Sequence, residues 1–255
     1  MRAHLTQLCL VGLVSILGAC GASAQVTTWQ VDGETREGMV YAPAAAQGGE
    51  SVPLVLAFHG FGDNMQNFRG VNVHGAWPDA VVVYFQGLER RRGLLGWQVE
   101  DDGVDRDLKL VDVALASLRE SYNIDDDRIY ATGFSNGGMF TYLLWAERPQ
   151  VFAAYAPVAA RLRPSVRPTH PRPIFHVAGQ GDRQVDFVDQ TAAIDIAIST
   201  NDVRGTTPCG DGCTIHGPGT PAPVMAWIHA GGHVYPRETS ERIVAFFRDH
   251  ARTKH

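Results

Sequence analysis

The chain has 255 residues, a length that fits one large domain rather than two. Apolar residues make up 45% of it and charged residues 19%, which is the composition of a globular protein with a substantial core. The formal net charge is −5, and the one basic cluster, Arg90-Arg91-Arg92, is interpreted as a solvated loop. These features argue against a nucleic-acid partner.

The N-terminus resembles an export signal. Arg2 supplies a positive charge, and residues 8–17 form an apolar segment too short to span a bilayer. Cleavage after Ala22-Ser23-Ala24 would release a secreted or periplasmic protein, and this is the favoured interpretation. Residues 17–20 also resemble a lipobox, in which Cys20 would be lipidated and the product a lipoprotein. No later apolar run approaches the length of a transmembrane span.

Short apolar runs recur through the rest of the chain. Residues 26–31 and 39–41 flank Asp32-Gly33, which predicts an antiparallel strand pair and a turn. Later runs lack polar alternation, as strands buried on both faces of a parallel sheet do. These runs are residues 53–58, 81–85, 128–134, 153–158, 173–178 and 223–228.

Helical patterns lie between these runs. The clearest covers residues 105–122, where Leu108, Val111, Leu115 and Leu118 share one face. The other predicted helices are residues 135–147, 187–198 and 238–250. Strands that alternate with helices predict an α/β fold with a mostly parallel central sheet flanked by helices. We therefore expect residues 1–24 to be a signal peptide and residues 25–255 a single domain.

Gly133-Phe134-Ser135-Asn136-Gly137 lies between a predicted strand and a predicted helix. A Ser on such a tight turn is the nucleophile elbow of α/β-hydrolases, so we predict the α/β-hydrolase fold and Ser135 as its nucleophile. The neighbouring positions must be small, and we expect the glycines to adopt the unusual backbone angles of the turn. The five-residue pattern is weak alone, and the flanking strand and helix carry the prediction.

A nucleophilic Ser needs a base that removes its proton. In this fold the catalytic His follows the last strand. His233 comes after residues 223–228 and after Gly231-Gly232, which let the loop bend, so we predict His233 as the base. The alternative is His229, which continues the strand.

The base in turn needs an acid that orients it, and the acid lies between the Ser and the His in the chain. Asp182 is the first carboxylate after residues 173–178, and we predict it as this acid. Asp186 is the alternative, although its place in the next turn suits the N-cap of the following helix.

Attack by Ser135 creates a negative oxygen that two backbone N–H groups must stabilise. We predict the N–H of Asn136, which follows the nucleophile, and that of Phe61, in the loop after residues 53–58. Aromatic side chains are expected to line a cleft that stacks a phenolic acyl group. These are Trp97, Phe134 and Tyr235, with Phe61 and Met139 beside them.

Cys209 and Cys213 are the cysteines that remain after cleavage at Ala24, and they lie in a Gly-rich loop. In an oxidising compartment they predict a local disulfide. Metal binding is a poor alternative because a second ligand pair with matching spacing is missing. We expect neither a metal nor another cofactor.

Several segments resemble secreted esterases of the polyhydroxybutyrate depolymerase and feruloyl esterase group. They are residues 59–63, the decapeptide 130–139, the acid loop 179–185 and Gly231-Gly232-His233, with a looser match around Trp97. The resemblance extends from about residue 40 to the C-terminus. Departures are Gly181 and Arg183, where the group usually has Ala and Pro, and Val234-Tyr235, where Thr-Trp is commoner.

This resemblance implies a serine esterase that uses Ser135, Asp182 and His233. Members of the group cleave feruloyl or acetyl esters on plant polysaccharides, or short polyhydroxyalkanoates, so the expected partner is a small-molecule, polysaccharide or polyester ester. The alternative is a non-catalytic protein of the export compartment that keeps the scaffold as a binding module.

Overall fold

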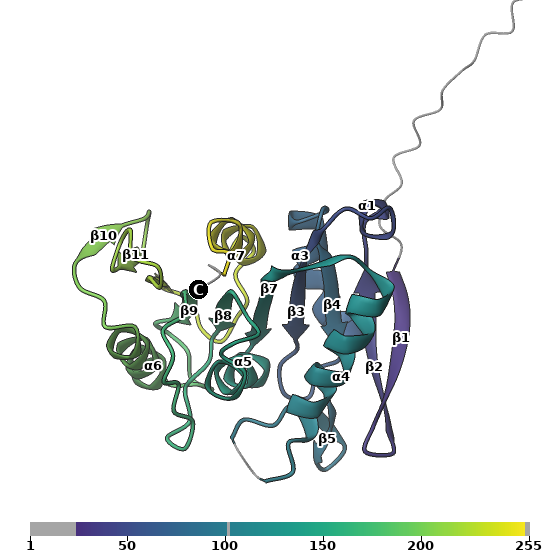
Figure 1. Ribbon diagram of the computed structural model, residues 1–255. Helices are drawn as coiled ribbons and strands as arrows, with labels where there is room; N and C mark the ends of the chain where they lie inside the picture. The colour runs from purple at the N-terminus through teal and green to yellow at the C-terminus, as the bar shows by residue number, and fades with distance from the viewer. Residues whose placement is uncertain (1–23, 101–102, 253–255) are drawn as a thin grey trace, which may run out of the picture.

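The computed structural model describes residues 24–100 and 103–252. Within them, ten strands form one sheet in the order β1-β2-β4-β3-β7-β8-β9-β12-β11-β10 (Figure 1). The strands from β4 to β12 in this order pair in parallel, as predicted. They are β4 (Val81–Phe85), β3 (Val52–Phe58), β7 (Ile124–Phe134), β8 (Ala154–Val158), β9 (Ile174–Gly179) and β12 (Val224–His229). The predicted signal peptide and Cys20 lie outside the described residues, apart from Ala24.

Antiparallel strands extend both edges of the sheet. β1 (Ala24–Val31) and β2 (Glu34–Tyr41) pair across Asp32-Gly33, where both residues have positive φ, of 50° and 85°. This confirms the predicted turn, because such two-residue hairpin turns require left-handed backbone. At the other edge, β11 (Cys213–His216) pairs with β12 and with β10 (Thr206–Pro208). The predicted Cys209–Cys213 disulfide is confirmed and closes the turn between β10 and β11.

Helices cover both faces of the sheet. α4 (Arg106–Ser121), α5 (Asn136–Glu147) and α6 (Phe187–Thr200) pack on one face. α7 (Thr239–Arg248) packs on the other, with the one-turn helices α2 (Met65–Phe68) and α3 (Val73–Ala76). Figure 1 shows α5 and α7 on opposite sides of β8. No helix in the described part of the chain combines the length and apolar character needed to cross a membrane.

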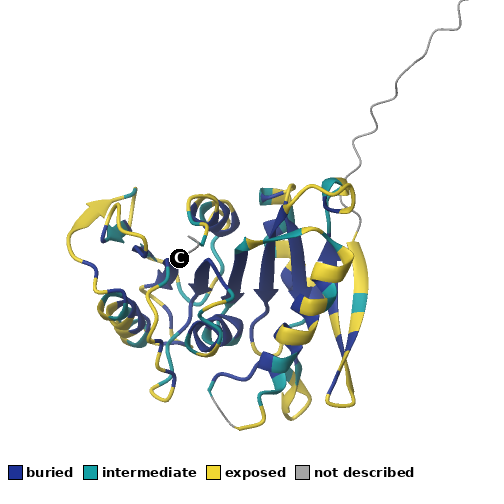
Figure 2. Ribbon diagram, viewed as in Figure 1, coloured by how far each residue is buried: buried dark blue, intermediate teal, exposed yellow. Residues whose placement is uncertain are grey.

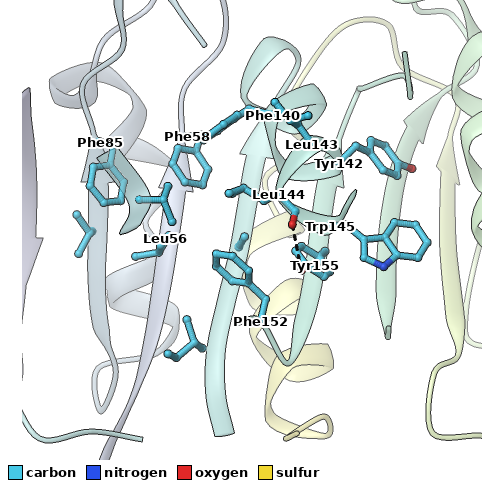
Figure 3. Packing of buried hydrophobic residues seen from close by; sticks show 14 of the residues in the cluster. Leu56, Phe58, Phe85, Phe140, Tyr142, Leu143, Leu144, Trp145, Phe152 and Tyr155 are labelled. Carbon is cyan, nitrogen blue, oxygen red and sulfur yellow. Dashed lines mark hydrogen bonds between the residues drawn. The ribbon is translucent and has the colours of Figure 1, made fainter. Parts of the chain in front are cut away.

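The core is densest where α5 crosses the central strands. Every residue of β3 and β4 is buried, whereas α4 and α6 are exposed along their outer sides (Figure 2). Phe58 stacks on Phe85 at 5.5 Å and meets Phe140 of α5 edge-on at 4.9 Å (Figure 3). Because α5 is covered almost all round, it lacks the one-sided apolar stripe of a surface helix. The residue before α5, Ser135, is therefore attached to a helix that is buried on almost every side.

The structure contains short elements that the sequence did not indicate. A hairpin, β5 (Leu88–Arg91) and β6 (Leu94–Gly96), stands where Arg90-Arg91-Arg92 was interpreted as a solvated loop. Arg91 and Arg92 are exposed as expected, but the Arg90 guanidinium donates to the Trp97 carbonyl at 2.5 Å. α1 (Ala44–Gln47) and the 3-10 turn Arg69–Val71 also lie in predicted connections.

A buried ion pair joins β2 to α4. The Arg36 guanidinium donates to Asp107 Oδ1 at 2.7 Å, and both side chains are almost wholly buried. Asp107 Oδ2 accepts from the Gln98 N–H at 2.6 Å and from Arg106 at 2.9 Å. Burial lowers the pKa of Arg36, although Asp107 opposes this shift. Removing one member of a buried pair leaves the other charge uncompensated.

We expect Asp107→Ala to lower the free energy of unfolding by about 3–5 kcal/mol, because it leaves the buried Arg36 guanidinium without its carboxylate partner. Urea denaturation measures this loss. The matched control is Asp112→Ala on the same helix, whose ion pair with Arg148 is partly exposed and contributes about 1 kcal/mol or less. Equal losses in the two variants would contradict this account of the pair.

Candidate active site

Ser135 occupies the turn between β7 and α5, with φ 53° and ψ −114°. An L-residue adopts such a backbone conformation only where the surrounding structure imposes it. Here the Ser135 N–H donates to the Val158 carbonyl at 2.8 Å, and its own carbonyl accepts from the Met139 N–H at 2.9 Å. The residue is thus fixed on both sides, in the conformation that a nucleophile elbow requires.

The glycines around Ser135 serve close packing. We expected them to take the unusual backbone angles of the turn, and this was wrong, because the positive φ belongs to Ser135 itself. A Cβ added at Gly137 would lie 2.1 Å from the Phe58 carbonyl oxygen, and one at Gly133 would lie 2.4 Å from the Gly137 carbonyl carbon. The elbow is therefore tight against β3, and side chains at these positions are sterically excluded.

We expect Gly137→Ala to destabilise the fold by about 3 kcal/mol or more, because the added methyl group meets backbone that cannot yield. Urea denaturation of the variant measures the effect. In the control variant, Gly48→Ala, the added Cβ has no neighbour closer than 3.5 Å, so we expect a change within about 0.5 kcal/mol. A Gly137→Ala protein as stable as the parent would disprove the steric argument.

Asp182 and His233, which lie 51 residues apart, meet at the carboxyl ends of β9 and β12. The His233 Nδ1 and Asp182 Oδ2 atoms are 2.7 Å apart, and their side chains are 9% and 0% exposed. Backbone hydrogen bonds join the two loops, since the Gly181 N–H donates to the Gly231 carbonyl at 2.9 Å. A Cβ on Gly179 would lie 2.5 Å from the Gly232 carbonyl oxygen, so glycine is what permits this close approach.

Four donors surround the Asp182 carboxylate. Oδ1 accepts from the backbone N–H groups of Gln184 and Val185 at 2.9 and 3.0 Å. Oδ2 accepts from the Gln190 amide at 2.9 Å and from His233. Burial alone would raise the pKa of Asp182, but the hydrogen bonds outweigh burial and lower the pKa. An ionised Asp182 can only accept, so Nδ1 of His233 carries the hydrogen and Nε2 is left as the basic nitrogen.

The imidazole of His233 lies beside the elbow. Its ring centroid is 4.8 Å from that of Phe134, the residue immediately before Ser135. Within the described part of the chain, the Ser135 hydroxyl makes no hydrogen bond to His233. Such a contact is often long in an unliganded hydrolase and tightens when substrate binds.

The two alternative residues have other surroundings. His229 ends β12, and its Nδ1 accepts from the Gly231 N–H at 3.1 Å, which holds the bend that leads to His233. Asp186 is exposed at the N-cap position of α6, although its side chain makes no capping hydrogen bond. The structure therefore brings Asp182, rather than Asp186, to His233.

The loop after β3 places Phe61 close to the elbow. A Cβ on Gly60 would touch the Phe134 ring at 3.2 Å. His59 is fully buried, with Nδ1 2.7 Å from the Gly60 carbonyl and Nε2 accepting from the Gly87 N–H at 3.0 Å. Burial lowers the pKa of His59, so the neutral ring donates on one side and accepts on the other. This imidazole thereby holds the loop that carries the Phe61 N–H.

The backbone N–H groups of Phe61 and Asn136 have no hydrogen-bond partner among the described residues. The next N–H along, that of Gly62, donates instead to the Leu95 carbonyl at 2.7 Å, so the β5–β6 hairpin braces the loop. Both predicted oxyanion donors are thus left available for a ligand oxygen.

Trp97 does not line a cleft, contrary to the prediction. It is fully buried between Phe58 and Phe140, so substrate cannot reach it. Its indole N–H donates to the His59 carbonyl at 2.8 Å, and its backbone N–H donates to Asn136 Oδ1 at 2.6 Å. Trp97 thus connects the Phe61 loop with the first residue of α5. The sequence did not reveal this bracing role of Trp97 and of the Asn136 side chain.

Phe134 and Tyr235 line a groove of about 550 Å³ together with Phe68 and Val71. Its remaining walls are mostly polar and include Asp63, Asn67, Asn72, Arg237 and Glu241. The Tyr235 hydroxyl is paired with Ser240 at 3.1 Å, so Tyr235 offers a ring rather than a free hydroxyl. Phe61 is 45% exposed, whereas Met139 packs against the core. Larger hollows, of about 680 and 640 Å³, lie around Arg172 and Met225, away from Ser135.

In the described residues, no group of three or more His, Cys, Asp or Glu side chains is arranged to hold a metal ion. The groups gathered around Ser135 are a hydroxyl, an imidazole, a carboxylate and two backbone N–H groups. This set suits acyl transfer.

Comparison with known proteins finds hydrolases with similar sequences. The model of the prolyl oligopeptidase family, Peptidase_S9, matches residues 106–166, which span α4, the elbow and β8. The chain is 33% identical over 165 residues to the bifunctional acetylxylan esterase/xylanase XynS20E of Neocallimastix patriciarum, covering 61% of this chain and 22% of that protein. It is 25% identical over 159 residues to feruloyl esterase B of Neurospora crassa, covering 58% and 53%. The chain thus spans about a fifth to a half of the length of these relatives.

Solved structures share the fold at low sequence identity. Acetyl xylan esterase from Aspergillus awamori superposes with a TM-score of 0.69 at 14% identity, covering 89% of this chain and 99% of that one. The Bacillus cereus carboxylesterase gives 0.64 at 15% identity, covering 84% and 94%. The chain therefore has the α/β-hydrolase fold.

Proposed function

We propose that the protein is an exported serine carboxylic-ester hydrolase that works through an acyl-enzyme. Ser135 is the nucleophile, His233 the base and Asp182 the acid that orients the base. The observation that carries this proposal is a strained elbow Ser beside an imidazole whose Nδ1 is held 2.7 Å from a buried carboxylate.

The reaction follows from the positions of these groups. His233 Nε2 takes the Ser135 proton as Oγ attacks the ester carbonyl carbon, and Asp182 stabilises the imidazolium. The carbonyl oxygen becomes negative and accepts hydrogen bonds from the N–H groups of Phe61 and Asn136. The C–O bond then breaks, the alcohol leaves with the proton from His233, and an ester to Ser135 remains. Water activated by His233 hydrolyses this ester and restores the hydroxyl.

The groove beside Phe134 supports an ester with an aromatic or sugar component. Phe134 and Tyr235 offer ring faces for stacking, and the polar wall that includes Asp63 and Asn67 suits hydroxyl groups. Two relatives carry the names acetylxylan esterase and feruloyl esterase. The proposed substrates are accordingly feruloyl or acetyl esters of polysaccharides, with short polyhydroxyalkanoates as a further class. The disulfide agrees with an oxidising compartment.

Parallel assays on methyl ferulate, acetylated xylan and hydroxybutyrate oligomers test the substrate class. We expect hydrolysis of the first or second to exceed that of the oligomers, and Ser135→Ala to abolish it. Activity on hydroxybutyrate oligomers alone would contradict the preference for feruloyl or acetyl esters and favour the polyhydroxyalkanoates. No hydrolysis of any of these esters, together with no reaction with a serine-directed phosphonate, would favour the non-catalytic binding protein.

A further inference from the structure

A line of buried polar side chains extends from Asp182 into the core. It consists of Gln190 on α6, His176 on β9 and Tyr142 on α5, which are 0%, 0% and 1% exposed. Polar groups this deeply buried destabilise a fold unless they are paired with one another. The surrounding core is otherwise largely apolar. The contacts of these three side chains indicate a function that offsets the cost of burying them.

Gln190 directly fixes the carboxylate. Its Nε2 donates to Asp182 Oδ2 at 2.9 Å and to the Val185 carbonyl at 2.8 Å. Because both partners are acceptors, this end of the amide is the NH₂ group. The same Oδ2 atom accepts from His233 Nδ1 at 2.7 Å. Gln190 is thus the one side chain besides His233 that donates to the Asp182 carboxylate in the described structure, since the other two donors are backbone N–H groups.

His176 and Tyr142 lie behind Gln190. The Tyr142 hydroxyl and His176 Nδ1 are 2.6 Å apart. Burial raises the pKa of Tyr142, so the hydroxyl keeps its proton and can donate to Nδ1. Burial also lowers the pKa of His176, to about 4, so the ring is neutral and Nε2 carries its one hydrogen.

The His176 Nε2–H and the Gln190 Oε1 atom are complementary. Each is buried, and neither has a hydrogen-bond partner within 3.5 Å among the described residues. Burial lowers the pKa of His176, and the neighbouring Gln190 side chain opposes this shift, as a nearby acceptor would. In the order Tyr142, His176, Gln190 and Asp182, each group can donate to the next, and the first and last of these three contacts lie within hydrogen-bond distance.

We propose that Gln190, held by His176 and Tyr142, is a positioning residue that fixes the Asp182 carboxylate against His233. This inference rests on the proposed function of Asp182 and His233. Gln190 touches no substrate and acts only through the carboxylate. Its amide prevents rotation of the carboxylate about its own axis, and the two residues behind it prevent the amide from turning over.

The test compares Gln190→Leu in the parent and in an Asp182→Asn background, with p-nitrophenyl acetate as substrate and enzyme in excess for the weakest variant. We expect Gln190→Leu to lower kcat about ten-fold in the parent with KM unchanged, because misplaced catalytic groups lose rate rather than binding. In Asp182→Asn the same change should cost less than about two-fold, since residues that act as one unit are not additive. Equal losses in both backgrounds would show a merely structural role and overturn the proposal, as would an unchanged kcat.

A milder variant covers the case in which Gln190→Leu does not fold. Tyr142→Phe removes one hydroxyl from the far end of the line, and its matched control is Tyr155→Phe. Both tyrosines are fully buried on the α5 side of the sheet (Figure 3), but the Tyr155 hydroxyl contacts only backbone carbonyls of Leu144 and Arg148. We expect kcat to fall about two- to five-fold in Tyr142→Phe and to stay unchanged in Tyr155→Phe. A parent enzyme without ester hydrolysis would refute the proposed function, whereas an active parent with unaffected Tyr142→Phe and Gln190→Leu variants would refute this inference alone.

Discussion

Ser135→Ala is expected to lower kcat/KM for p-nitrophenyl acetate by about 10⁴–10⁶-fold, because it removes the atom that forms the acyl-enzyme. The fold should survive. The Ser135 side chain makes no hydrogen bond to another described residue, and Ala occupies the same left-handed backbone with the same Cβ. Steady-state kinetics and thermal unfolding of the purified variant measure both quantities.

The control is a second Ser→Ala variant, which shows whether loss of a Ser hydroxyl far from the site also lowers activity. Ser121 is exposed at the end of α4, where its hydroxyl donates to the Ser117 carbonyl at 2.9 Å. Ser121→Ala should leave kcat/KM within about two-fold of the parent. If Ser135→Ala kept most of the parent activity, Ser135 would not be the nucleophile, and the geometry of the elbow would need another explanation.

Asp182→Asn is expected to lower kcat by about 10⁴-fold. An amide in place of the carboxylate can accept through one atom only, although four donors face this side chain. In either orientation of the introduced amide, its NH₂ group lies against donors that need an acceptor. In the orientation in which the NH₂ group faces His233, it donates to Nδ1. His233 would then carry its hydrogen on Nε2 and could not accept the Ser135 proton.

The same substitution has a pH-dependent effect on stability. The folded-state pKa of Asp182 is lowered from its model-peptide value of 3.8, so the carboxylate stabilises the fold fully above that value. This contribution is lost as the pH falls through the lowered folded-state pKa. Urea denaturation should therefore show a large stability difference between the parent and Asp182→Asn at pH 7, and a difference that shrinks as the pH falls through the lowered pKa of Asp182.

Asp186→Asn is the control for both measurements, because Asp186 is exposed and four residues away. We expect its kcat within about two-fold of the parent and its free energy of unfolding at pH 7 within about 0.5 kcal/mol of the parent. A large loss of kcat in Asp186→Asn with an active Asp182→Asn would exchange the roles of the two carboxylates.

The sequence alone predicts the buried strands of the sheet and the two residues, Asp182 and His233, that follow strands. Runs such as Val81–Phe85 are apolar throughout because both faces of the strand are covered, and this predicts a parallel sheet directly. Asp182 and His233 follow from their places after the strands, since the carboxyl ends of parallel strands meet at one edge. Chain order left Asp186 and His229 as alternatives, and the contact of 2.7 Å between Asp182 and His233 distinguishes them.

Features that depend on tertiary neighbours were not predicted. The prediction of Trp97 as a cleft residue is wrong because an aromatic side chain suits a core or a site equally well, and only its packing between Phe58 and Phe140 distinguishes the two. The importance of Gln190 and His176 appears only once α6 lies against β9. The sequence predicts positive φ at the neighbouring glycines because Gly adopts it most easily. In the structure Ser135 has the positive φ, and the absent side chain of Gly137 is needed for close approach to β3.

Treatment of the parent protein with a fluorophosphonate, followed by intact mass measurement and peptide mapping, tests the central assignment most directly. The account predicts one adduct per chain, on the peptide that contains Ser135, and a large loss of labelling rate in His233→Ala. An adduct on another residue, or a folded protein that does not react, would contradict it.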